Sequence, residues 1–159
     1  MRDWLAVRAD ATPTATALRA FGPIEADRSY AELDERLAGV GVGVDDAVAI
    51  CADTRPGYVE IVHAAQRLGA ALVPINARQT PAEIERQLDR VAPSAVVCER
   101  DTEAAVLEAA DADVLSLETS GEAKPLSDVS PRRFDLPEWE LDDPLAVLFT
   151  SGTTGDPKG

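Results

Sequence analysis

The chain has 159 residues, of which 45% are apolar and 4% are aromatic, and its net charge at pH 7 is −14. This length suits one domain with an aliphatic core. The acidic excess argues against a nucleic-acid partner, because phosphate backbones require a basic surface. No apolar run approaches the roughly 18 residues of a membrane span, and charges at Asp3, Arg8 and Asp10 interrupt any signal-peptide core. We therefore expect a cytoplasmic protein without a membrane span.

The acidic excess itself has two interpretations. It could be an ordinary acidic surface, or it could be an adaptation to a salt-rich (halophilic) cytoplasm. Self-repulsion at this charge destabilises a compact state unless salt screens it, and near 1 M salt the screening length falls to roughly 3 Å. Salt adaptation is the hypothesis we favour.

The potential metal ligands are sparse. Cys51 and Cys98 lie far apart, each inside an apolar run, and His63 is the one histidine. This spacing matches no metal-binding motif, so we expect no metal site, two buried thiols and a structural His63.

The first half of the chain alternates helical and strand-like segments. A short helix over 3–9 precedes a hairpin whose strands cover 15–21 and 26–29. Ser29 and Glu32 have the spacing of a capping box and predict a helix there. Alternating Gly and Val over 39–44 indicate a turn and contain no GxGxxG motif.

Regular βα units follow. Strands are expected over 47–52, 71–75, 94–98 and 114–117. A first helix is expected over 56–68 and ends at Gly69. A second begins at the capping pair Thr80 and Glu83, and a third covers 102–110. The prolines and acidic residues of 118–143 are typical of a long surface connection, and 145–149 (LAVLF) predicts a last strand.

This order predicts an α/β fold with a mostly parallel sheet flanked by helices. Runs such as AVAIC and SAVVC are apolar throughout instead of alternating with polar residues. Strands buried on both faces have this pattern.

The chain ends in FTSGTTGDPKG, a glycine- and hydroxyl-rich segment directly after the last predicted strand. Glycines allow backbone N–H groups to approach an anion closely, and hydroxyls and a lysine can bind phosphate oxygens. Walker A is excluded, because it requires Gly-Lys-Ser/Thr after a four-residue gap. A phosphate loop and a flexible tail that binds nothing remain as alternatives.

The segment 150–159, TSGTTGDPKG, resembles the phosphate-loop signature of the adenylate-forming (acyl-CoA synthetase, AMP-binding) superfamily. Upstream, SYAEL (29–33) and RLGAALVPIN (67–76) resemble two further segments of that family, in the same order. The resemblance implies that residues 1–159 are the N-terminal part of an AMP-binding domain ending in the phosphate loop, with the C-terminal domain absent.

The resemblance also implies two-step chemistry with ATP, Mg²⁺ and coenzyme A. A small-molecule carboxylic acid is activated as an acyl-adenylate, and a thiol then displaces AMP. Catalytic residues remain unassigned, because the family's lysine and acid pocket lie in segments that this sequence does not contain. The residues expected to bind ATP are Thr150, Ser151, Gly152, Thr153, Thr154, Gly155 and Lys158.

Several functions stay open within this resemblance. The compact start is similar to o-succinylbenzoate–CoA ligases of menaquinone biosynthesis, and a fatty-acid–CoA ligase or a carrier-protein-loading adenylation domain are alternatives. The family usually has a longer helix between the positions of Glu32 and Val44. A shortened helix and a chain ending inside the ATP loop also fit a truncated, non-catalytic relict. We expect the 159-residue chain to be inactive alone.

Overall fold

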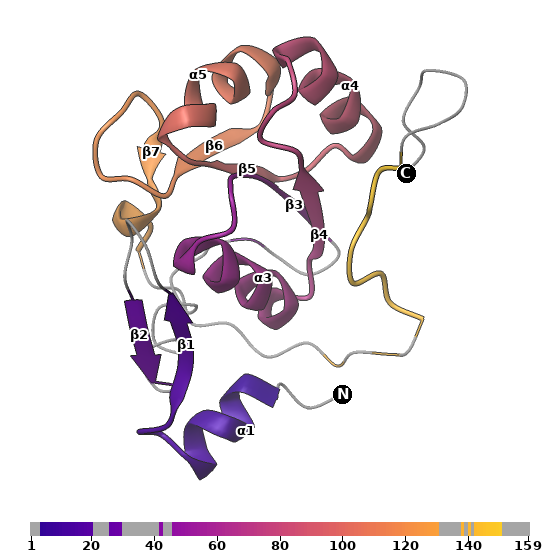
Figure 1. Ribbon diagram of the computed structural model, residues 1–159. Helices are drawn as coiled ribbons and strands as arrows, with labels where there is room; N and C mark the ends of the chain where they lie inside the picture. Colours follow the sequence, from indigo (N-terminus) through magenta and orange to yellow (C-terminus); the bar gives the residue numbers. More distant parts are fainter. Residues whose placement is uncertain are drawn as a thin grey trace.

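The fold is described by a computed structural model covering residues 4–20, 26–29, 42, 46–130, 138, 140 and 142–150. Its centre is a five-stranded parallel sheet in the order β4-β3-β5-β6-β7, and a separate antiparallel hairpin pairs β1 with β2 (Figure 1). The strands are β1 (Thr16–Ala20), β2 (Ala26–Ser29), β3 (Ala47–Cys51), β4 (Ala71–Ile75), β5 (Ala95–Cys98), β6 (Asp113–Ser116) and β7 (Lys124–Pro125).

Helices cover both faces of this sheet. The helices of the described residues are α1 (Trp4–Ala11), α3 (Pro56–Leu68), α4 (Pro81–Val91) and α5 (Arg100–Ala109), with a 3-10 turn η1 at Leu126–Asp128. Helix α3 packs on one face, and α4 and α5 pack on the other (Figure 1). The α/β fold with a mostly parallel, helix-flanked sheet is therefore confirmed.

Burial along the central strands explains their unbroken apolar sequences. In β3, Val48 and Ile50 join the core cluster beneath α3, whereas Ala49 and Cys51 join the cluster beneath α4 and α5. Successive side chains of a strand point to opposite faces, so a strand covered on both faces needs apolar residues at every position. Both cysteines are buried as expected.

Local sequence signals set the helix ends. Pro56 occupies the first turn of α3, and Gly69 ends it with a left-handed φ of 76° that favours glycine. At α4, the backbone N–H of Thr80 donates a hydrogen bond to Glu83 Oε2 at 2.8 Å. The predicted capping pair is confirmed.

Several predicted boundaries are wrong. Helix α5 begins at Arg100 instead of Thr102, because Thr102 lies at the third helical position and its Oγ1 accepts a hydrogen bond from the backbone N–H of Glu99 at 3.1 Å. Helix α1 continues to Ala11, beyond the predicted end at Ala9. The helix predicted after Ser29 and most of the glycine turn lie outside the described residues.

The long surface connection predicted over 118–143 contains a short strand and a 3-10 turn that the sequence did not predict. Lys124 and Pro125 form β7, which pairs in parallel with Leu115 and Ser116, and η1 follows directly. A two-residue strand has no periodicity of its own, so only its long-range pairing defines it.

Candidate nucleotide site

The segment 145–150 extends the sheet beyond β4. The backbone N–H of Leu72 donates a hydrogen bond to Leu145 O at 3.1 Å, and Val147 N–H donates to Leu72 O at 2.8 Å. These bonds form a parallel bridge between Leu72 and Ala146. The strand predicted over 145–149 is thus present as a short parallel pairing. Its carboxyl end points to the same edge of the sheet as the carboxyl ends of β3, β4 and β5.

That direction determines where Thr150 lies. Of the predicted ATP-binding residues, Thr150 is described, and it is exposed at the carboxyl edge. The other members of the set lie outside the described residues, so their placement stays a prediction: Ser151, Gly152, Thr153, Thr154, Gly155 and Lys158.

The strand order also creates a topological switch point. The chain runs from β3 outward through α3 to β4, then crosses back to β5 on the other side of β3 and continues to β6. The loops after β3 and β5 therefore diverge to opposite faces. In open α/β sheets, ligands commonly bind in the crevice at this point.

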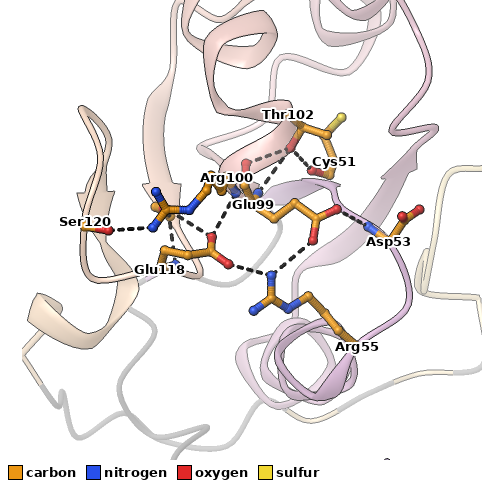
Figure 2. A network of polar contacts seen from close by, with 9 residues as sticks. Cys51, Asp53, Arg55, Glu99, Arg100, Thr102, Glu118 and Ser120 are labelled. Atoms are coloured by element: carbon orange, nitrogen blue, oxygen red, sulfur yellow. Dashed lines mark hydrogen bonds and ion pairs between the residues drawn. The ribbon is translucent and has the colours of Figure 1, made fainter. Parts of the chain in front are cut away.

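At this point in the sheet, charged side chains from three loops meet (Figure 2). Arg55, which follows β3, places its Nη1 3.1 Å from Glu99 Oε2 and 2.6 Å from Glu118 Oε1. The other oxygen of Glu99 accepts a hydrogen bond from the backbone N–H of Asp53 at 2.7 Å. We call Arg55, Glu99 and Glu118 the switch-point network. It joins the loops that follow β3, β5 and β6.

Further hydrogen bonds hold the network in place. Glu118 Oε2 accepts a hydrogen bond from the backbone N–H of Arg100 at 2.9 Å, and the Arg100 side chain donates to Ser120 Oγ at 2.6 Å. The buried Thr102 hydroxyl donates to the carbonyl of Cys51. These bonds tie the start of α5 to the ends of β3 and β6 (Figure 2).

The network places one guanidinium between two carboxylates. Burial alone lowers the pKa of Arg55, but hydrogen bonds and charge attraction from Glu118 and Glu99 outweigh this effect and raise the pKa above its ordinary value. The guanidinium therefore stays charged and keeps its carboxylate partners satisfied. A ligand entering here would have to break these ion pairs.

The thiols of Cys51 and Cys98, at the ends of β3 and β5, are not reactive. Burial is the largest effect on both, and it raises the pKa of Cys51 to about 11 and that of Cys98 to about 12. Both remain protonated at neutral pH, so neither is a nucleophile or a thiolate ligand. Within the described ranges, no group of three or more His, Cys, Asp or Glu residues could hold a metal ion.

Sequence reasoning missed the switch-point network, although a signal for it was present. Each member closely follows a predicted apolar strand: Arg55 after the strand ending in AICA, Glu99 directly after AVVC, and Glu118 directly after VLSL. Charged residues at the carboxyl ends of parallel strands converge at one edge. His63, expected to be structural, lies on α3 with its ring centroid 5.1 Å from that of Trp4 in an edge-on contact.

The fold defines a class: an open α/β domain with a parallel sheet covered by helices on both faces. Residues 5–159 match the family described as AMP-binding enzyme, and the chain belongs to that family.

Individual members of the family can be compared with this chain by sequence identity. The chain is 34% identical over 160 residues to a feruloyl-CoA synthase from an Amycolatopsis species, covering 98% of this chain and 32% of that protein. It is also 34% identical over 166 residues to the 2-succinylbenzoate–CoA ligase of Geobacillus kaustophilus, covering all of this chain and 32% of that one. The chain thus spans about a third of the length of these relatives.

Solved structures show the same fold. The o-succinylbenzoate CoA synthetase of Bacillus subtilis, in complex with its acyl-adenylate intermediate, superposes with a TM-score of 0.81 at 24% identity, over 100% of this chain and 32% of that one. A luciferase-like enzyme from the mealworm Zophobas morio gives a TM-score of 0.84 at 18% identity, over 98% and 40%. At this level of identity the likeness concerns the fold.

Within the described residues, no helix is long and apolar enough to span a membrane.

Proposed function

We propose that this chain is the ATP-phosphate-binding part of an AMP-forming acid–CoA ligase. A carboxylate attacks the α-phosphate of ATP and displaces pyrophosphate, and the thiol of coenzyme A then attacks the acyl-adenylate and displaces AMP. The observation that carries the proposal is the parallel pairing of Leu145 and Val147 with Leu72, which brings Thr150 to the carboxyl edge of the sheet. The phosphate-loop sequence starts at this edge.

Phosphate binding in this proposal is electrostatic. Hydroxyls of Thr150, Ser151, Thr153 and Thr154, backbone N–H groups near the glycines, and Lys158 stabilise the charge that develops on the leaving pyrophosphate. When bound with ATP, Mg²⁺ would supply further positive charge. Because the chain carries a net charge of −14, such local donors are needed before ATP can approach.

For the acid, we propose an aromatic carboxylate, with 2-succinylbenzoate as the first candidate. The 2-succinylbenzoate–CoA ligases of Geobacillus kaustophilus and Listeria monocytogenes support it, at 34% and 30% identity. Ferulate is the second candidate, because a feruloyl-CoA synthase is 34% identical. Because these 159 residues span about a third of such relatives, they are inactive alone in this proposal.

A chimera tests the proposal. This chain replaces the matching third of the Geobacillus kaustophilus ligase, and ATP–pyrophosphate exchange is measured with 2-succinylbenzoate, ferulate and octanoate. We expect exchange with an aromatic acid and none with the isolated chain. Exchange with octanoate alone would replace the aromatic acid by a fatty acid, and a folded chimera without any exchange would favour the non-catalytic relict.

Two substitutions in the active chimera test the phosphate loop. Lys158→Ala removes a positive charge, and Gly155→Val obstructs close approach of the backbone to phosphate. Each is expected to lower pyrophosphate exchange by about 100-fold or more. Asp111→Ala, at an exposed carboxylate before β6, is the control and should leave the rate unchanged. Unchanged exchange in both loop variants would refute the phosphate-binding role.

A further inference from the structure

The loop after β4, residues 76–80, lies beside Thr150 at the carboxyl edge of the sheet. The parallel bridge between Leu72 and Ala146 sets the register of the two strands. Four positions further along both strands, this register places Asn76 level with Thr150. The strand residues before these two share the core cluster beneath α4 and α5, as the same register requires.

Two hydrogen bonds fix the backbone of this loop. The backbone N–H of Arg78 donates to Asn76 Oδ1 at 3.0 Å, and the backbone N–H of Gln79 donates to Asn76 O at 3.1 Å. The first of these bonds defines an Asx turn. Thr80 follows directly as the cap of α4. The Arg78 side chain is therefore carried on an ordered turn, which lowers the entropy lost when a ligand binds to it.

The guanidinium of Arg78 has no partner in the part of the chain that the structure describes. Its side chain is exposed and makes no hydrogen bond or ion pair there. Arg55 and Arg100, which also lie near the carboxyl edge, bind carboxylate or hydroxyl oxygens. The nearest acidic residue along the chain, Glu83, accepts hydrogen bonds from Thr80. In a chain of net charge −14, Arg78 thus keeps its five N–H donors for an anion from outside.

We propose that Arg78 is a further binding residue for a phosphate group of a nucleotide co-substrate, ATP or coenzyme A. A planar guanidinium donates two parallel hydrogen bonds to phosphate oxygens, which makes arginine well suited to this contact. The register places its turn beside Thr150, where the segment that resembles the phosphate loop begins. The assignment rests on the proposed function, because that function supplies both co-substrates.

The test uses the Geobacillus kaustophilus chimera. The KM for ATP is measured by pyrophosphate exchange, and the KM for coenzyme A is measured by thioester formation. Arg78→Ala should raise one of these KM values by about 10-fold or more and change kcat by less than about 2-fold. The co-substrate whose KM rises is the source of the phosphate. Arg78→Lys keeps the charge but loses the bidentate contact, so its effect should be smaller.

Arg86→Ala is the matched control. Arg86 is an exposed arginine on α4 that acts electrostatically on Glu83, and its removal changes the net charge by the same amount. Both KM values should stay unchanged in this variant. A similar rise in Arg86→Ala and Arg78→Ala would overturn the proposal, because a general loss of positive charge would then explain it. Unchanged KM values for both co-substrates in Arg78→Ala would overturn it as well.

A binding measurement separates this proposal from the proposed function. Isothermal titration calorimetry gives the Kd of ATP and of coenzyme A for the chimera and for its Arg78→Ala variant. If a folded chimera lacked pyrophosphate exchange but Arg78→Ala still weakened one Kd by about 10-fold, the proposed function would fail and the role of Arg78 would stand. Equal Kd values for chimera and variant would refute the role of Arg78, and so would a chimera that binds neither nucleotide.

Discussion

Ala92, at the C-terminal end of α4, has φ 44° and ψ 60°, and it is the one non-glycine residue with positive φ in the described ranges. Its N–H still closes the helix by donating to Leu88 O at 2.7 Å. A left-handed backbone costs an L-residue roughly 1–2 kcal/mol, whereas glycine adopts it freely. The hydrogen bond that closes the helix is therefore kept although alanine disfavours a left-handed backbone.

Ala92→Gly is expected to stabilise the fold by about 0.5–1 kcal/mol. Relief of the left-handed backbone exceeds the extra unfolded-state entropy of glycine. Urea unfolding monitored by circular dichroism measures the change. Ala104→Gly, at an exposed position inside α5, is the control and should destabilise by about 1 kcal/mol. Equal losses in both variants would contradict the prediction.

Glu83 gives a pH-dependent prediction. Hydrogen bonds from the backbone and side chain of Thr80 lower the pKa of Glu83 below its ordinary value of 4.5. A lowered pKa in the folded state contributes stability above the unfolded pKa, and this contribution is lost as the pH falls through the folded pKa. Glu83→Ala should therefore lower the Tm at pH 7, and the difference from the parent should shrink below about pH 4.

Glu85→Ala, at an exposed position of the same helix, is the control for this experiment. It removes the same charge without disrupting the cap. A Tm deficit of Glu83→Ala that stayed constant from pH 7 to pH 3 would show that packing, and not the ionised carboxylate, produces the effect.

At the scale of elements, the switch-point network joins the loops that follow three neighbouring strands of the sheet. Arg55, Glu99 and Glu118 come from the loops after β3, β5 and β6, and their side chains are 20%, 12% and 17% exposed. Removing the Arg55 guanidinium would leave the carboxylates of Glu99 and Glu118 close together where their side chains are mostly buried. Breaking one partner of a buried ion-pair set is costly because the remaining charge is not compensated.

Arg55→Ala is accordingly expected to destabilise the fold by about 2–4 kcal/mol, measured by urea unfolding. Arg78→Ala, an exposed arginine after β4 with the same change in net charge, should remain within about 0.5 kcal/mol of the parent. Combining Arg55→Met with Glu99→Gln and Glu118→Gln should recover part of the loss, because no charge then stays unpaired. A similar loss in the free energy of unfolding for Arg55→Ala and Arg78→Ala would show that the network does not stabilise the fold.

At the scale of the whole molecule, the net charge of −14 dominates the surface. Mutual repulsion opposes the compact state, and salt weakens it. We expect the Tm to rise as KCl is increased from about 0.1 M to about 2 M. Glu85→Gln with Glu108→Gln neutralises two exposed carboxylates, changing the charge from −14 to −12, and should flatten that salt dependence. A Tm independent of KCl would exclude salt adaptation.

The sequence by itself determined the elements from β3 to β6 and the family. Unbroken apolar runs identify strands buried on both faces, and Pro56, Gly69 and the pair Thr80 and Glu83 mark helix ends. These signals act over a few residues, so they can be recognised without knowing the fold. The segment 150–159, which resembles the family's phosphate loop, is likewise a local signal.

Only the tertiary structure decided which edge residues meet. Arg55 reaches Glu99 and Glu118 across 44 and 63 positions of sequence. Lys124 becomes a strand by pairing with Leu115, and the segment around Ala146 joins the sheet beside Leu72. Such contacts depend on strand order and register, which arise when the whole sheet packs between its helices, and no short stretch of sequence encodes them.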